Sequence, residues 1–196
     1  MKELRKYILS ILSIVFFMMA VFQEHQTLNH HPELKLIETF RKTLLNQESK
    51  LSSNLDDAEK KLADSTSTTN YLSNFSYLNH LFGDEGLGFI IFKDQRMVFW
   101  SDNQFAFPNS SNILLTQDRL ITLPNGIYSV QKRVIGKYQL VGLVNLKNNY
   151  TYENQFLENT FQAPFDLPAG YQITSAKDKN AHEIRDEANE YLFSVL

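Results

Sequence analysis

The sequence contains no cysteine among its 196 residues, which excludes disulfides, thiolate zinc sites and cysteine nucleophiles. It also lacks a Gly-x-Ser-x-Gly nucleophile motif and a Walker A phosphate loop. His30 and His31 are adjacent, whereas metal-binding histidines usually lie three to five residues apart on one face. We therefore expect no catalytic residues, no metal and no cofactor in this chain.

The chain has no excess of positive charge. Its formal net charge is −3, and the first six residues contribute +2 through Lys2, Arg5 and Lys6 against Glu3, so the remainder carries about −5. This balance predicts no nucleic-acid partner. Aromatic residues are plentiful, with 15 Phe and 9 Tyr, which is enough for a packed core.

Residues 7–22 form an uncharged and mostly apolar run. Basic residues precede the run and polar residues follow it, which is typical of a segment that enters a membrane from the cytoplasm. As a helix the run spans roughly 24 Å, slightly less than the roughly 30 Å hydrocarbon core of a bilayer. Snorkelling by Lys6 and local bilayer thinning can close that gap. We predict a cytoplasmic tail over 1–6 and a transmembrane helix over 7–22.

Two other interpretations of this run stay open. A cleaved signal peptide requires small residues at its cleavage site, but Met18 precedes Ala20 by two positions and Phe22 is bulky. A buried core helix is the other interpretation, although a helix that is apolar all round suits a membrane better. The anchor and the signal peptide both place residues 23–196 outside the cytoplasm.

Residues 32–63 have the pattern of one long helix. Pro32 suits a first helical turn, and about 30 helical residues would extend roughly 45 Å. Glu48 and Asn54 lie on or beside the apolar stripe and weaken it. Within the juxtamembrane region 23–69, this helix is either a stalk, which could form part of a dimer, or a helix packed on its own domain. The stripe recurs at three- and four-residue steps: Ile37, Phe40, Leu44, Leu51, Leu55, Ala58 and Leu62.

Residues 70–196 change from helical to strand periodicity. A second helix is expected over 70–82, ended by Gly83 and Gly86. The expected strands are 88–92, 96–100, 120–123, 127–134, 138–146, 171–175, 182–185 and 190–195.

Turn residues separate these strands. Asn125-Gly126 favours positive φ at both positions, and Asn189 suits a left-handed turn. Gly142 inside a strand predicts that a side chain or ligand comes close to the backbone.

A further helix is expected over 150–160. Asn148 or Asn149 would cap it. Its buried side would consist of Tyr152, Phe156, Leu157 and Phe161. The whole order predicts an α+β fold in which an antiparallel sheet of about five strands is flanked by helices.

Six residues near strand ends are the best candidates for a ligand-binding site. An aromatic cage with a cation and a carboxylate could hold a small polar or anionic ligand. The alternative is that the aromatic residues belong to the core and the charged residues are solvated. The candidate ligand-binding residues are Trp100, Asp102, Asn103, Tyr128, Lys132 and Tyr138.

Several stretches resemble the extracytoplasmic PAS-like or Cache-like sensor region of bacterial membrane histidine kinases, over about residues 5–196. These stretches are 99–103 (Phe-Trp-Ser-Asp-Asn), 125–128 (Asn-Gly-Ile-Tyr), 138–146, 150–159 and 191–194 (Tyr-Leu-Phe-Ser). The resemblance implies that 70–196 is the sensor domain, held by its membrane helix in the bacterial inner membrane with the N-terminus in the cytoplasm.

The resemblance also implies partners. These are the lipid bilayer, a second copy of the chain in a homodimer, and a small ligand or periplasmic protein. A cytoplasmic response regulator would be reached only through a transmitter that this chain lacks, so any kinase activity would reside outside it. The same module on a chemoreceptor or cyclic-dinucleotide enzyme, and a membrane-anchored assembly protein without a ligand, remain alternatives.

Overall fold

The computed structural model of the chain describes residues 11–21, 32–64, 71–106 and 118–196. The chain divides into two compact units, Met1–Thr39 and Phe40–Leu196, whose boundary falls inside one long helix. The second unit contains two β-sheets and every residue of the candidate site described below.

In the first unit, residues 11–21 are helical and their side chains are exposed. None of the described helices combines the length and the apolar character needed to cross a membrane. The predicted run 7–22 extends beyond this helix on both sides. The predicted cytoplasmic tail 1–6, residues 22–31 between the two helices and residues 65–70 after the long helix lie outside the described residues.

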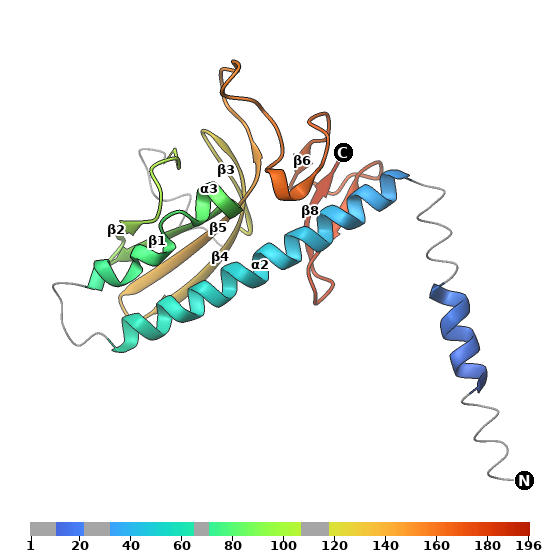
Figure 1. Cartoon of the computed structure of the whole chain (residues 1–196), viewed down its shortest axis with the longest axis horizontal. Helices are drawn as coiled ribbons and strands as arrows, with labels where there is room; N and C mark the ends of the chain where they lie inside the picture. Colours follow the sequence, from blue (N-terminus) through green and yellow to red (C-terminus); the bar gives the residue numbers. More distant parts are fainter. Residues whose placement is uncertain (1–10, 22–31, 65–70, 107–117) are drawn as a thin grey trace, which may run out of the picture. The chain divides into compact units, whose positions relative to one another are not determined.

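Helix α2 (Pro32–Asp64) confirms the predicted long helix and its first residue. Within the second unit it lies along one face of the larger sheet, as Figure 1 shows. All stripe residues from Phe40 onward are buried: Phe40, Leu44, Leu51, Leu55, Ala58 and Leu62. Over this length α2 therefore packs against its own chain, because burying this stripe is what stabilises so long a helix.

Two short helical segments replace the single helix expected over 70–82. They are the 3₁₀ helix η1 (Tyr71–Leu78) and helix α3 (Leu81–Glu85). His80 separates them with a left-handed backbone, φ 84°, which an α-helix cannot accommodate. Gly83 lies inside α3, and Gly86 alone ends it, with φ 71°.

The larger sheet has five antiparallel strands, as the sequence pattern predicted, and the structure places them in the order β2-β1-β5-β4-β3. Its central strands β1 and β5 are the most buried, in agreement with their continuous apolar runs. The strands are β1 (Leu87–Lys93), β2 (Arg96–Trp100), β3 (Leu120–Leu123), β4 (Gly126–Ile135) and β5 (Tyr138–Asn148). Residues 107–117, between β2 and β3, lie outside the described residues.

The turns match the predicted positions with one difference in geometry. Asp94 and Gln95 join β1 to β2, and both have positive φ, as tight hairpin turns require. Pro124 and Asn125 join β3 to β4, but neither Asn125 nor Gly126 has positive φ. The prediction of a left-handed Asn-Gly pair was wrong, because Gly126 is already the first paired residue of β4.

The two faces of this sheet have different partners. One face carries Gly142, where an added Cβ would lie 2.8 Å from Leu51 Cδ1 of α2. This contact confirms that the strand glycine permits a close approach. The opposite face builds an apolar cluster from the sheet, α3 and the segment after β2: Phe82, Ile90, Phe92, Phe105, Ile121, Leu123, Tyr128, Val130, Val141 and Leu143.

The helix expected over 150–160 does not form. The chain instead continues from β5 into an irregular loop, closed by single bridges between Lys147 and Phe161 and between Asn154 and Leu157. Phe161 is buried as predicted, but Tyr152 and Phe156 are 73% and 82% exposed. Asparagine side chains bind the backbone of this loop, and such bonds compete with helix formation.

A second, three-stranded sheet follows the 3₁₀ helix η2 (Ala163–Phe165), in the order β6-β8-β7. The predicted hairpin is confirmed, with Asn189 at φ 64° in its turn. The strand expected over 171–175 shortens to two residues. The strands are β6 (Ile173–Thr174), β7 (His182–Arg185) and β8 (Tyr191–Val195).

Candidate functional site

The six residues predicted to bind a ligand are spread over the larger sheet. Trp100, Ile90, Val141 and Lys132 form one row across β2, β1, β5 and β4. Three strand spacings therefore separate Trp100 from Lys132, roughly 14 Å. Tyr128 pairs with Asn145 of β5, and Tyr138 lies seven positions before Asn145 on the same strand. Tyr138 and Tyr128 are therefore separated by roughly 23 Å along the strands. The predicted cage is not formed.

Trp100, Asp102 and Asn103 do lie together at one corner of the sheet. The Trp100 indole is 47% exposed and donates a hydrogen bond to Asn103 Oδ1 over 2.8 Å. Asp102 Oδ1 accepts a bond from the Gln104 backbone N–H at 2.7 Å. These contacts stabilise the turn after β2, and they use two of the polar groups that a ligand would need.

Tyr128 is a core residue. Its ring is fully buried, lies 5.8 Å from the Phe105 ring, and its hydroxyl donates to Asn125 Oδ1 over 3.2 Å. Burial raises the pKa of this phenol well above its ordinary value. Burial also lowers the pKa of Lys132, partly offset by Asp118. Tyr138 lies beside the ammonium groups of Lys93 and Lys137, 5.6 and 5.9 Å from its ring centre.

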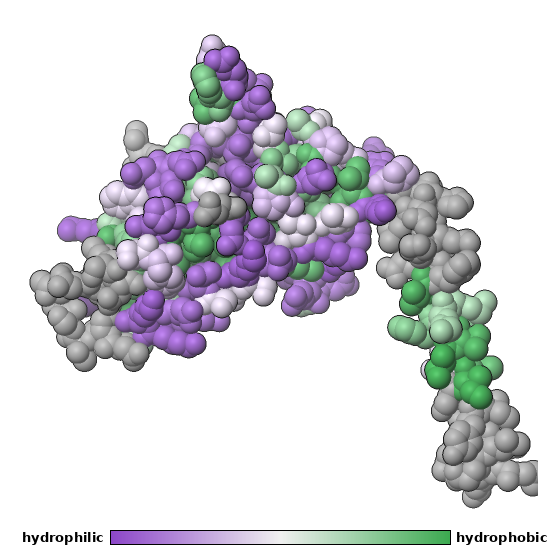
Figure 2. Space-filling view, viewed as in Figure 1, coloured by the Kyte–Doolittle hydropathy of each residue, from purple (hydrophilic) through white to green (hydrophobic). Residues whose placement is uncertain are grey.

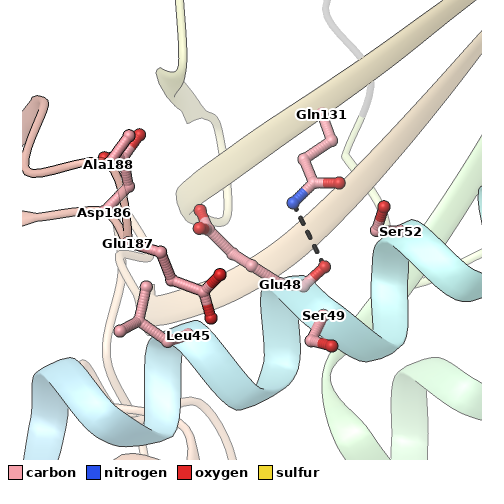
Figure 3. A pocket seen from close by; sticks show the side chains of 8 residues that line it. All are labelled: Leu45, Glu48, Ser49, Ser52, Gln131, Asp186, Glu187 and Ala188. Atoms are coloured by element: carbon pink, nitrogen blue, oxygen red, sulfur yellow. Dashed lines mark hydrogen bonds between the residues drawn. The ribbon is translucent and has the colours of Figure 1, made fainter.

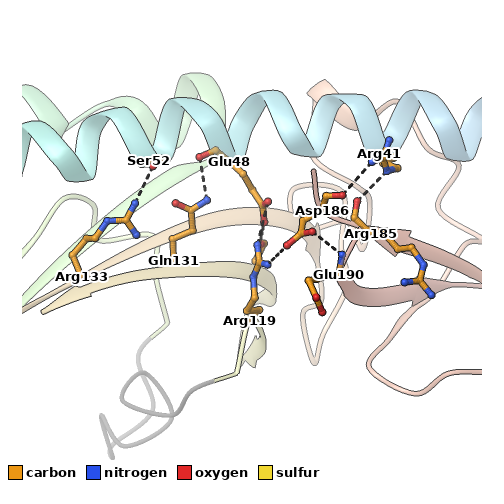
Figure 4. A network of polar contacts seen from close by, with 10 residues as sticks. Arg41, Glu48, Ser52, Arg119, Gln131, Arg133, Arg185, Asp186 and Glu190 are labelled. Atoms are coloured by element: carbon orange, nitrogen blue, oxygen red, sulfur yellow. Dashed lines mark hydrogen bonds and ion pairs between the residues drawn. The ribbon is translucent and has the colours of Figure 1, made fainter. Parts of the chain in front are cut away.

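The structure brings a different set of polar residues together between α2 and the sheet. We call Glu48, Arg119, Ser129 and Asp186 the polar seam, and Figure 4 labels three of them, Glu48, Arg119 and Asp186. Glu48 projects from α2 and is only 5% exposed. Its Oε1 accepts a 2.5 Å hydrogen bond from Ser129 Oγ of β4, and its backbone oxygen accepts one from Gln131 Nε2. The buried carboxylate thus fastens the helix to the sheet.

Arg119 and Asp186 extend the seam to the turn between β7 and β8. The Arg119 guanidinium lies between two carboxylates, 3.5 Å from Glu48 Oε2 and 2.7 Å from Asp186 Oδ2. Arg41 of α2 donates to the backbone oxygens of Arg185 and Asp186 at 2.9 and 3.3 Å. One helix is therefore joined to both sheets through polar contacts that depend on geometry and charge.

A cavity of about 370 Å³ lies beside the seam (Figure 3). Its wall includes the carboxylates of Glu48, Asp186 and Glu187, which come from α2 and from the β7–β8 turn. The remaining lining residues are Leu45, Ser49, Ser52, Gln131 and Ala188. A movement of the β7–β8 turn relative to α2 would change the size of this cavity.

The two seam carboxylates have opposite pKa shifts. Burial raises the pKa of Glu48 above its ordinary value of 4.5, although the Ser129 hydrogen bond and the Arg119 charge oppose the rise. The Glu190 backbone N–H holds the pKa of Asp186 below its ordinary value of 3.8, and Arg119 adds to this effect. Asp186 therefore stays ionised to a lower pH than an ordinary aspartate, and Glu48 takes up a proton at a higher pH than an ordinary glutamate.

Replacing Glu48 with glutamine is expected to change the pH dependence of stability. Folding raises the pKa of Glu48, so the wild-type carboxylate destabilises the fold progressively as the pH rises above 4.5. Each tenfold difference in proton affinity between the folded and unfolded chain costs about 1.4 kcal/mol. Glu48→Gln removes this loss, so the free energy of unfolding of the variant should rise relative to that of the wild type as the pH increases from 4.5 to 7. Urea unfolding of the full chain at both pH values measures the difference.

Ser129→Ala is the matched control for this change. The hydroxyl lowers the Glu48 pKa, so its removal should make the loss of stability with rising pH larger, not smaller. Asp186 does not interfere, because its contribution is complete above pH 3.8 and is lost only as the pH falls. Equal pH slopes in wild type, Glu48→Gln and Ser129→Ala would contradict a raised Glu48 pKa.

The carboxylates of the seam are engaged by other side chains. Within the described residues, no group of three or more His, Cys, Asp or Glu side chains could hold a metal ion. Glu48 and Asp186 are both bound by Arg119, so neither is poised as a nucleophile. The arrangement is suited to a reversible contact between elements.

One residue in the sequence pointed to the seam. Glu48 interrupts the apolar stripe of α2, and a carboxylate on a buried face requires partners. The partners of Glu48 are Arg119 and Ser129, which lie 71 and 81 positions further along the chain. Asp186, which Arg119 also binds, lies 138 positions beyond Glu48. No local pattern marks such distant residues, so only the tertiary structure could identify them.

No protein-family model matches the chain, and neither a curated protein nor a solved structure is significantly similar to it. Function therefore has to be inferred from the residues and their geometry.

Proposed function

We propose that this chain is the membrane-anchored, extracytoplasmic sensor module of a bacterial two-component histidine kinase. Residues 7–22 cross the inner membrane, the N-terminus lies in the cytoplasm, and α2 joins the membrane segment to a PAS-like domain that works as a homodimer. The five-stranded antiparallel sheet with its flanking helices is the architecture that the sequence resemblance implies. A transmitter outside this chain would phosphorylate the response regulator.

The observation that carries the proposal is the buried position of the Glu48 carboxylate on α2. The helix that begins ten residues after the apolar run holds a buried carboxylate, and that carboxylate contacts β4 and the Arg119–Asp186 pair. A ligand or stress that alters the seam gives α2 a different preferred position. The helix can then convey this as a shift or rotation toward the membrane.

The test fuses residues 1–196, through a second membrane helix, to the transmitter of a histidine kinase. Arg119→Ala breaks the bridge between Glu48 and Asp186 and should change basal phosphotransfer at least about 5-fold, the lower end of typical coupling. A flexible Gly-Ser insertion near residue 28 should abolish this difference. The same insertion after Lys179, in an exposed loop, should preserve it.

Two results would contradict the proposal. An Arg119→Ala fusion with wild-type output would show that the seam does not set the signalling state. A response to Arg119→Ala that persists after the insertion near residue 28 would show that α2 does not transmit it.

One observation favours the alternative of a membrane-anchored assembly protein without a small ligand. Phe105 covers Gly88 on the sheet face opposite α2, and its ring packs 4.4 Å from Phe82 and 5.8 Å from Tyr128. This packing leaves no space for a ligand over Gly88, on the sheet face that also carries Tyr128. Sensor modules of chemoreceptors and cyclic-dinucleotide enzymes would use the same seam and differ only in the attached output domain.

A further inference from the structure

The loop of residues 149–160 between β5 and η2 exposes its largest apolar side chains. Every residue from Thr151 to Glu158 is exposed, and Tyr152, Phe156 and Leu157 are 73%, 82% and 37% accessible. Figure 1 shows this orange loop extending away from the sheet, and Figure 2 shows a hydrophobic patch on the same protrusion among hydrophilic residues. We call residues 149–160 the arm.

The base of the arm is fixed by paired hydrogen bonds. The backbone N–H of Asn148 donates to the Thr160 oxygen at 2.8 Å, and that of Gln162 donates to the Leu146 oxygen at 3.1 Å. Further out, Asn159 Oδ1 accepts from the Tyr150 N–H at 2.6 Å, and its Nδ2 donates to the Tyr150 oxygen. The arm is thus held along both of its sides.

The tip of the arm is fixed as well. Asn154 and Leu157 exchange two backbone hydrogen bonds of 3.1 and 3.2 Å. The side-chain oxygen of Asn154 also accepts from the N–H groups of Phe156 and Leu157. Glu153 Oε1 accepts from the Asn159 N–H at 2.8 Å. Phe156 therefore projects from an ordered backbone.

An ordered tip with exposed aromatic residues has the properties of a protein-binding element. Isolated exposed apolar residues are common, but here three lie within six positions of one loop. Aromatic side chains are the commonest anchors of protein interfaces, and a preformed backbone reduces the entropy lost on binding. The arm is therefore built to insert into a complementary cleft.

The charge of the arm indicates its partner. Residues 148–176 contain no lysine or arginine, while Glu153 and Glu158 flank the apolar tip. A cleft edged with Lys or Arg would complement these carboxylates. An anionic lipid surface would repel them, although lipid could accept the aromatic side chains.

We propose that the arm is a docking element for a second protein, of a different kind, whose apolar cleft is edged by Lys and Arg. Phe156 and Tyr152 enter the cleft, and Glu158 contacts its basic edge. This interaction goes beyond the proposed signalling role and does not depend on it, because the polar seam and the arm share no residue.

The test uses p-benzoylphenylalanine at position 156 of the full chain, produced in its own cells and irradiated there. We expect a cross-link to one protein, and none from the same probe at Val134, which is 74% exposed on β4. The cross-linked protein is then purified and its affinity for the full chain is measured. Phe156→Ala should weaken binding at least about 10-fold, and Val134→Ala should not change it.

The charge requirement is tested with Glu158→Gln in the same assay. This variant should weaken binding and reduce its dependence on salt. Full retention of binding by Phe156→Ala and Glu158→Gln overturns the proposal. So does a cross-link to a second copy of this chain, to lipid, or to several proteins equally. Phe156 makes few contacts, so circular dichroism of Phe156→Ala should match the wild type and exclude misfolding as the cause.

Discussion

Replacing Phe40 with alanine is expected to lower the free energy of unfolding by about 3–5 kcal/mol. The side chain is fully buried where α2 meets the C-terminal part of the chain. Its ring lies 5.9, 4.9 and 6.2 Å from the rings of Phe161, Phe165 and Phe193. Alanine is a better helix former than phenylalanine, so the whole loss would come from packing.

Urea unfolding of the full chain, followed by circular dichroism, measures this change. Phe156→Ala is the matched control, because it deletes the same atoms from a side chain that is 82% exposed. We expect the control to change stability by no more than about 0.5 kcal/mol. Similar losses in both variants would mean that Phe40 does not hold α2 to the second sheet.

Gly88→Ala is expected to destabilise the chain by about 1–3 kcal/mol, or more if Phe105 is expelled from its place. A Cβ at this position would lie 1.7 Å from Phe105 Cζ. The ring cannot move aside easily because Phe82 and Tyr128 pack against it. The same unfolding experiment measures the effect, and Phe105→Leu should partly restore the double variant.

Gly83→Ala is the matched control, and we expect it not to destabilise the chain. Gly83 lies in α3, and an added Cβ there would meet nothing within 4 Å. This change should leave stability unaltered or increase it by about 0.5–1 kcal/mol, because alanine favours helix. A Gly88→Ala variant as stable as Gly83→Ala would mean that Phe105 does not fill the sheet face, and a ligand could then occupy that space.

The elements that were predicted correctly from the sequence have local causes. The stripe of α2 repeats at helical steps over its own length, and β4 and β5 are joined by a short turn at Gly136. Each such element can be recognised within one stretch of sequence. The order of the strands follows from pairing these hairpins around β1 and β5.

The predictions from the sequence were wrong where contacts between distant residues, or side-chain bonds to the backbone, decide the structure. Tyr152, Phe156 and Leu157 recur at nearly helical steps, but Asn154 and Asn159 bind the backbone and stabilise a hairpin-like arm instead. The ligand cage failed for a different reason. Strands β1 and β5 lie between Trp100 on β2 and Lys132 on β4, and the sequence alone does not show this strand order.

Helix α2 contacts residues that lie far along the chain, so these contacts can form only late in synthesis. The oxygen that receives the Arg41 hydrogen bond belongs to a residue 144 positions later. At 5–20 residues per second, a ribosome needs roughly 7–29 s to deliver it. For most of this interval the ring partners of Phe40, which are Phe161, Phe165 and Phe193, have not yet been synthesised. We therefore expect the apolar stripe of the nascent helix to stay exposed until the C-terminal part of the chain emerges.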